Sequence, residues 1–274
     1  MRISCCVWGL PTEEADAVRK LTGLGFSSID VRPFALEQTD LSSSGQIDSS
    51  SSGQTDSSSA LADTGASVCC LAASFGLIEA ASLEHGDPAS RAGAIAYTQR
   101  AIEHASDLGA EAVYLVPGKD DSQAALSRYA AVMAPLAQRA QDRGMTLSLE
   151  HFPGLALPTV AATRAFVESV DHPNLHVLVD IGHAQMEGIT PATAIEIAGD
   201  RLGYVHLDDN DGVGDLHQAL LDGMLTETAL QDTFTAIGSV GYSGAVSLEL
   251  SPALDEPEVG LRRSLDIVRR LSRQ

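Results

Sequence analysis

The sequence predicts one α/β domain that spans residues 1–274 and folds as a (β/α)₈ TIM barrel. Three observations lead to this fold class. Short runs rich in β-branched residues alternate with longer helical patterns, eight such pairs can be counted, and 274 residues suit a barrel of this kind. The expected strands are Ile3–Trp8, Ser28–Arg32, Val68–Ser74, Ala112–Val116, Thr146–Glu150, His176–Asp180, Tyr204–His206 and Ala245–Glu249.

The segments between the expected strands carry apolar residues at helical spacing, as in "TEEADAVRKLTGLG" and "SQAALSRYAAVMAPLAQRAQDRG". Glycine often ends a helix because it adopts a left-handed backbone without steric cost. Four of these segments end in this way, at Gly25, Gly109, Gly144 and Gly241. The last segment, "GLRRSLDIVRRLSRQ", is expected to form the eighth helix.

One unit of the alternation is interrupted by a Ser/Gly-rich segment, residues 38–60, that follows the second expected strand. Its copies begin at Gln38, Gln46 and Gln54, a period of eight residues. The segment contains too few apolar residues to offset the entropy lost on ordering. We therefore expect a flexible, disordered insertion, with a short repetitive structured turn as the alternative.

Charge limits the classes of partner. The chain carries 37 acidic and 17 basic residues, a formal net charge of −20. Such a surface repels nucleic-acid phosphates and anionic lipid, so we expect neither nucleic acid nor membrane as a partner. The sequence leaves the oligomeric state open and is compatible with a homo-oligomer.

The four cysteines form two adjacent pairs, Cys5–Cys6 and Cys69–Cys70. Neighbouring residues of a strand point to opposite faces, so neither pair is placed to form a disulfide. Buried free thiols in a reducing compartment are the expectation. The first apolar stretch is too short for a signal peptide, and no run reaches the roughly 18 apolar residues of a membrane helix, which predicts a cytoplasmic location.

Four consecutive expected strands end in a side chain that can bind a metal: Glu150, Asp180, His206 and Glu249. Residues two apart on a strand share a face, and barrel enzymes place their active sites at the carboxyl ends of the strands. All four side chains should therefore point into the barrel mouth. Three carboxylates confined there repel one another unless a cation neutralises them.

A divalent metal ion meets that need. Three carboxylates with one imidazole suit Mn²⁺ first, and Mg²⁺, Co²⁺ or Zn²⁺ as alternatives. Each residue alone has a simpler explanation as a helix N-cap, a salt-bridge partner or a packing histidine. Four of them at successive strand ends favour the interpretation as a site for one metal ion.

The motifs "LSLEHFPG", "VLVDIGHA", "YVHLDDNDG" and "GYSGAVSLEL" resemble the xylose-isomerase-like TIM-barrel superfamily. That superfamily includes sugar-phosphate isomerases and epimerases, ketose 3-epimerases, inosose dehydratases and the AP endonucleases. The resemblance extends over the whole chain in order. It implies that Glu150, Asp180, His206 and Glu249 are metal ligands, and that Glu150 and Glu249 also move the proton from opposite faces of the substrate.

The resemblance thus implies a metal-dependent isomerase or epimerase of a small-molecule sugar or sugar phosphate. Such an enzyme abstracts a proton from the carbon next to a metal-bound carbonyl, and the reaction passes through an enediolate intermediate. A dehydratase (lyase) of a keto-polyol shares this first step and stays open as the alternative. An AP-endonuclease-like phosphodiester hydrolase is less favoured, because Ser74 and Val116 stand where the endonucleases carry metal-binding histidines at the third and fourth strands.

His183, Asp215 and His217 match family positions that bind substrate or a second metal ion. A second ion on these residues is the less favoured of the two roles. Since loop histidines often cap the turn that follows, this is the simpler explanation for His183.

The remaining candidates surround the expected site. Trp8, Phe75 and Phe152 are expected to form apolar pocket walls that flank a sugar, with ordinary packing as the alternative. His151 could orient Glu150 from outside the ligand shell. Lys119 and Arg32 could bind an anionic substrate group, although solvated loop charges are the favoured interpretation; structural roles are expected for His85, His104, His172 and His176.

Overall fold

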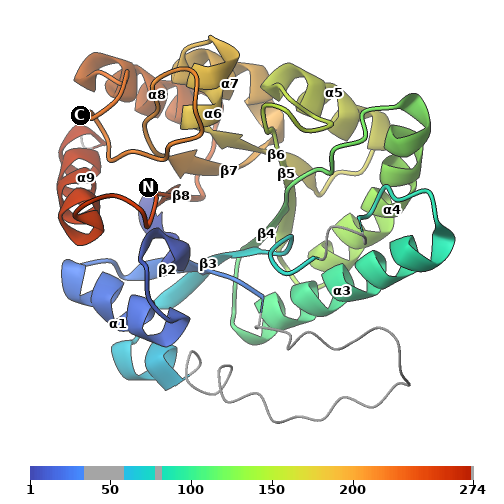
Figure 1. Cartoon of the computed structure of the whole chain (residues 1–274), viewed down its shortest axis with the longest axis horizontal. Coiled ribbons are helices and arrows are strands. Elements are labelled where there is room, and N and C mark those ends of the chain that lie inside the picture. The colour runs from blue at the N-terminus through green and yellow to red at the C-terminus, as the bar shows by residue number, and fades with distance from the viewer. Residues whose placement is uncertain (34–58, 78–81, 273–274) are drawn as a thin grey trace.

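A computed structural model describes residues 1–33, 59–77 and 82–272, and in it eight parallel strands form a barrel surrounded by helices (Figure 1). This confirms the predicted fold class. The strands are β1 Arg2–Cys5, β2 Ser28–Val31, β3 Ser67–Ala72, β4 Ala112–Leu115, β5 Thr146–Glu150, β6 Leu175–Asp180, β7 Leu202–Leu207 and β8 Ala245–Leu248.

The sheet runs in the order β1-β8-β7-β6-β5-β4-β3-β2. The barrel closes between its first and last members through a single isolated parallel bridge, between Cys6 and Asp30. The pairing of β2 with β3 shifts register between Ile29 and Asp30, next to this seam. Backbone pairing between neighbouring strands is therefore least extensive at the seam between β1 and β2.

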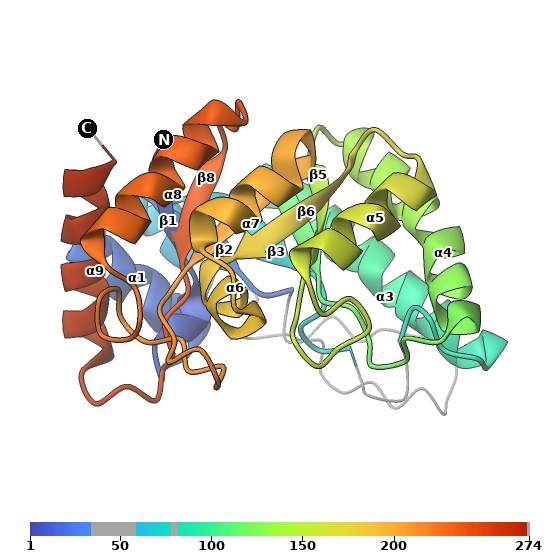
Figure 2. The same cartoon turned by 90° about the horizontal axis from the view of Figure 1, so that it is seen from above.

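Helices form the outer layer, and Figure 2 shows them around the strands from a second direction. The first and last helices, α1 and α9, contact each other and complete the outer ring. None of the described helices is both long and apolar enough to cross a membrane. Two 3₁₀ turns, η1 Val7–Gly9 and η2 Gly199–Arg201, accompany α1 Glu14–Leu24, α3 Pro88–Asp107, α4 Gln123–Gln141, α5 Val160–Val170, α6 Ile181–Glu187, α7 Pro191–Ala198, α8 Glu227–Ser239 and α9 Pro257–Leu271.

Local sequence sets the ends of these helices. The side chains of Asp87, Ser122, Thr159 and Thr226 each accept a hydrogen bond from the backbone N–H three residues later, at the starts of α3, α4, α5 and α8. The four glycines that were predicted to end helices all have a positive φ, between 70° and 103°. At Gly25 the left-handed backbone lets its N–H reach the carbonyls of Leu21 and Thr22.

Two buried layers stabilise the barrel. The larger layer lies between strands and helices and contains Leu149, Val179, Val205 and Leu248, the side chains that strand alternation directs outward. The smaller layer fills the barrel interior and contains Tyr114, Leu178, Tyr204 and Ala245. This alternation is what turns the polar strand-end residues toward the barrel axis.

Two sequence expectations need correction. The first strand ends at Cys5 rather than Trp8, because the chain turns into the η1 segment Val7–Gly9. Of the predicted insertion, residues 38–58 lie outside the described residues. Its last two residues, Ser59 and Ala60, begin a short helix over residues 59–64, and Ala60 is fully buried in the outer layer.

The histidine of α3 gives a testable pH dependence. Burial lowers the pKa of His104 from 6.5 to about 4. The unfolded chain therefore takes up a proton below about pH 6.5 that the folded chain refuses until about pH 4, so stability falls over this window. Relative to His104→Gln, the wild type should lose about 1 kcal/mol more between pH 7.5 and 5.5 in urea unfolding. Equal losses in the two proteins would contradict the buried neutral imidazole.

Candidate metal and substrate site

The structure brings the four expected metal ligands together at the carboxyl ends of β5 to β8. Glu150 and Asp180 are the last residues of β5 and β6, His206 lies in β7, and Glu249 directly follows β8. One ligand atom from each residue lies within 4.8 Å of the other three. Asp180 and His206 are fully buried, and Glu150 is 3% exposed. The group is thus compact and shielded from bulk water.

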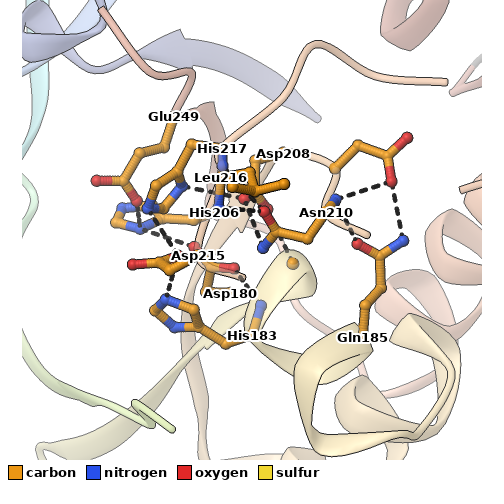
Figure 3. Close-up of polar contacts among 12 residues, drawn as sticks. Asp180, His183, Gln185, His206, Asp208, Asn210, Asp215, Leu216, His217 and Glu249 are labelled. Carbon is orange, nitrogen blue, oxygen red and sulfur yellow. Dashed lines mark hydrogen bonds and ion pairs between the residues drawn. The ribbon is translucent and has the colours of Figure 1, made fainter. Parts of the chain in front are cut away.

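His206 contacts the other three members of the group, and Figure 3 shows it close to two of them, Asp180 and Glu249. Its Nδ1 is 2.5 Å from Glu249 Oε2, 3.6 Å from Glu150 Oε1 and 3.9 Å from Asp180 Oδ2. Three carboxylates therefore approach one imidazole nitrogen from three strands.

Two of the carboxylates are oriented by their second oxygen. Asp180 Oδ1 caps α6 by accepting a hydrogen bond of 2.9 Å from the backbone N–H of His183, which leaves Oδ2 buried and without a hydrogen-bond partner among the residues in ranges 1–33, 59–77 and 82–272. Trp8 Nε1 donates a hydrogen bond of 2.6 Å to Glu249 Oε1. Both side chains are thereby held with one oxygen toward the centre of the group.

The pKa shifts show the cost of confining these charges. Burial raises the pKa of Glu150. Burial alone would lower the pKa of His206, but the Glu249 and Glu150 carboxylates raise it well above its usual value. Burial would raise the pKa of Glu249, yet His206 lowers it to about 2. Within this ligand set, the protonated ring of His206 is therefore the one positive charge, and it faces three carboxylates.

The donor set fits a divalent metal ion. It offers three carboxylates and an imidazole, a mainly hard set. Asp180 Oδ2 is buried without a hydrogen bond among the described residues, as expected of an atom that has another partner. An ion bound here would replace the imidazolium proton as the counter-charge.

A second polar cluster adjoins the first (Figure 3). Asp215 Oδ1 lies 3.3 Å from His183 Nε2 and 3.1 Å from His217 Nε2, and His217 Nδ1 lies 3.0 Å from Asp208 Oδ2. Burial would lower the pKa of His183, but Asp180 and Asp215 raise it to about 10. The predicted trio is thus brought together; ligand atoms of its three members lie within 4.8 Å of one another.

A cavity of about 260 Å³ opens beside both clusters. The three aromatic residues predicted to form its walls do line it, and Trp8 lies against Phe75 with ring centroids 4.9 Å apart. Phe152 lies against His183 at 4.3 Å. Among the described residues, neither lysine nor arginine lines this cavity. The lining consists of Trp8, Phe75, Tyr114, Val116, Glu150, Phe152, His183, His217, Glu249, Leu250, Ser251 and Pro252.

Sequence reasoning missed two residues of the site. Tyr114 lines the cavity, and Asp208 is fully buried and pairs with His217. Strand alternation carried the signal for both. Tyr114 lies two residues before Val116, and Asp208 lies two residues after His206, so each shares a face with a position already singled out.

Other candidates lie elsewhere than expected. Arg32 Nε contacts Glu14 Oε2 at 3.4 Å, and neither Arg32 nor Lys119 is among the cavity-lining residues. His151 does not orient the Glu150 carboxylate; its Nε2 lies 3.1 Å from the backbone oxygen of Asp180, because the ring turns toward β6.

The four histidines assigned structural roles lie outside the cavity lining, and two of them bind turns. His85 Nδ1 accepts from the backbone of Asp87, and His172 Nδ1 accepts from that of Asn174. After β3 and β4, Ser74 Oγ accepts a hydrogen bond of 2.7 Å from the backbone of Val116. Neither side chain supplies a metal-binding nitrogen there.

Comparison with known proteins identifies relatives. The chain is 30% identical over 224 residues to a ketose 3-epimerase of Arthrobacter globiformis, covering 77% of this chain and 73% of that protein. It is 27% identical to an L-ribulose 3-epimerase of Mesorhizobium japonicum, covering 89% and 78% of the two chains. The fold matches the crystal structure of a D-psicose 3-epimerase of Clostridium cellulolyticum H10, with a TM-score of 0.79, 17% identity and 99% of both chains covered.

The family model described as "Xylose isomerase-like TIM barrel" matches residues 18–271. This match includes all four members of the buried ligand group and both clusters at the barrel mouth. The chain therefore belongs to the xylose isomerase-like TIM barrel family.

Proposed function

We propose that this protein is a divalent-metal-dependent epimerase that inverts the carbon next to the carbonyl of a ketose. The observation that carries this proposal is the placement of Glu150 and Glu249. Both line the cavity, both belong to the buried ligand group, and they come from β5 and β8, which two other strands separate in the sheet. Relatives named as ketose and L-ribulose 3-epimerases support the same activity.

The chemistry follows from two carboxylates that face one cavity. A divalent ion held by Glu150, Asp180, His206 and Glu249 supplies the Lewis acidity that makes a C–H beside a carbonyl acidic. One of the two glutamates removes that proton and the other returns one to the opposite face of the planar carbon. Trp8 keeps Glu249 in place through its N–H, and the aromatic walls exclude water from the reacting carbon.

The cavity favours a neutral sugar over a sugar phosphate. A phosphate needs arginine, lysine or several backbone N–H groups to offset its charge. Neither lysine nor arginine lines the cavity among the described residues, and the internal undescribed segments 34–58 and 78–81 contain neither residue. The net charge of −20 adds a further repulsion.

We also propose that the bound metal ion is Mn²⁺, because three oxygen ligands and one nitrogen support it as the first choice. A dehydratase would use the same first proton transfer and differ in losing water. Phosphodiester hydrolysis is disfavoured because Ser74 and Val116, which follow the third and fourth strands, occupy positions where a trinuclear site needs histidines. His183, Asp215 and His217 are proposed to bind substrate hydroxyls, with a second ion as the alternative.

Metal content tests the ligand group. Metal-free protein dialysed against Mn²⁺ should bind about one ion per chain, and His206→Ala should lose it because a buried ligand is removed. His172→Ala, which removes an imidazole outside the cavity, should bind normally. Two ions in the wild type, with one lost in His217→Ala, would establish a second site. Undiminished binding by His206→Ala would contradict the assignment.

Exchange of the substrate proton with solvent tests the two glutamates. In D₂O, with metal bound, Glu150→Gln and Glu249→Gln should each lower deuterium incorporation into the ketose by about 10²-fold or more, since Gln cannot accept the proton. Glu168→Gln, on the exposed side of α5, is the matched control. NMR of the recovered sugar gives both the exchange and the product. Wild-type exchange in both variants would remove them as bases, and accumulation of a dehydrated product would favour the lyase.

Phosphorylated and free forms of one ketose test the inferred substrate class. We expect kcat/KM for the free sugar to exceed that for its terminal phosphate by about 100-fold, because a dianion would enter a cavity lined by Glu150 and Glu249, with neither lysine nor arginine among its described lining residues. The measurement is a paired kinetic assay of both compounds at equal ionic strength. Equal or better turnover of the phosphate would show that the sugar-binding face lies elsewhere.

A further inference from the structure

A buried carboxylate lies in the barrel interior close to the proposed metal centre. Asp30 is on β2 and is fully buried. Its oxygens accept hydrogen bonds from Ser4 Oγ at 2.6 Å and from the Tyr204 hydroxyl at 2.8 and 2.9 Å, while Cys6 Sγ lies 3.9 Å from Oδ2. These donors come from β1, from β7 and from the residue that follows β1, so the carboxylate on β2 connects two strands that β8 separates in the sheet.

Barrel closure does not require this carboxylate. Asp30 takes part in the single bridge to Cys6 at the β1/β2 seam, but that bridge uses only main-chain atoms. A fully buried carboxylate carries a large desolvation cost, and an apolar residue could form the same bridge without it. The side chain therefore calls for another explanation.

The neighbouring His206 gives a reason for a buried carboxylate at position 30. Its Nδ1 faces the three carboxylates of the ligand group, whereas Nε2 is buried and has no hydrogen-bond partner in the part of the chain that the structure describes. Ligand atoms of Cys6, Asp30 and His206 lie within 4.8 Å of one another. Tyr204, which holds Asp30, lies two residues before His206 on β7 and meets its ring edge-on at 5.8 Å.

We propose that Asp30 is a positioning residue for His206: it stabilises the Nε2–H side of the imidazole and so directs Nδ1 toward the metal ion. Histidines that bind metals commonly present their second nitrogen to a carboxylate, which sets the tautomer and makes the ligating nitrogen more basic. The attraction acts over at most 4.8 Å between two fully buried groups, where charges are screened less than in water. The inference rests on the proposed metal function and extends it to a residue on β2, a strand that carries none of the four proposed ligands.

Metal affinity of Asp30→Asn tests the proposal. Asn keeps the size of the side chain and an oxygen for Ser4 and Tyr204, but removes the charge. Mn²⁺ titrated into metal-free protein should bind about 10- to 100-fold more weakly than in the wild type. Competition with a fluorescent chelator gives the dissociation constant, and quenching of Trp8, the only tryptophan and a hydrogen-bond partner of Glu249, gives an independent readout.

Two tyrosine variants separate positioning from general stability. Tyr204→Phe frees Asp30 from its anchor and should weaken Mn²⁺ binding several-fold. Tyr242→Phe removes a half-buried hydroxyl that donates to the Ala245 carbonyl at 2.7 Å, and should lower the melting temperature without changing the metal affinity. If Asp30→Asn does not fold, the comparison of these two variants decides.

The outcomes distinguish the inference from the function on which it rests. A wild type that binds no ion would remove the proposed metal function, and the inference with it. A wild type that binds Mn²⁺, together with Asp30→Asn of equal affinity and reduced melting temperature, would overturn the inference alone and leave Asp30 as a structural residue. The same holds if Tyr204→Phe and Tyr242→Phe bind Mn²⁺ equally well.

Discussion

Electrostatic repulsion among three carboxylates at the barrel mouth is the constraint on which the site depends. Glu150, Asp180 and Glu249 converge on one nitrogen of His206 in a region largely closed to water. Like charges at such distances destabilise the folded chain unless a positive charge is present. The raised pKa of His206 and the lowered pKa of Glu249 show one solution, a proton on the imidazole. A divalent cation would offset the repulsion among the carboxylates more strongly.

The barrel fold accommodates this arrangement because the backbone geometry of the strands alone sets the direction of the four side chains. Parallel strands with a two-residue repeat place every second side chain inside, and their carboxyl ends meet at one rim. Secondary contacts then restrict each ligand: the N-terminus of α6 holds Asp180, and Trp8 holds Glu249. On our proposal, Asp30, which accepts hydrogen bonds from Tyr204, would restrict His206 in the same way.

The charge distribution links the site to its substrate. Most basic side chains of the described chain are engaged on the outside, as Arg2 is with Glu111 and Arg164 with Glu168. The cavity is left with aromatic walls, carboxylates and histidines. On the proposed function, such a surface would bind hydroxyl groups and sugar-ring faces in preference to anions. This agrees with the acidic net charge, which opposes nucleic acid as a ligand.

The fold class and the convergence of the four ligand positions could be derived from the sequence. Strand alternation, helix-ending glycines and N-cap residues are local signals, and local geometry obeys them, as at Gly25 and Ser122. The boundary at Trp8 was wrong, because the 3₁₀ turn after β1 depends on contacts that the local pattern does not contain. The same limit applied at Ala60, whose burial against the outer layer overrides a low-complexity composition.

Only the tertiary structure decided which side chains share a partner. Asp30 and His206 are separated by 176 positions in the chain, yet barrel closure brings their ligand atoms within 4.8 Å. The ring of His151 turns to the backbone of Asp180 instead of to its neighbour Glu150. Periodicity in a sequence determines the face on which a residue lies. The distance between two faces depends on strand order, register and closure, which are properties of the whole sheet.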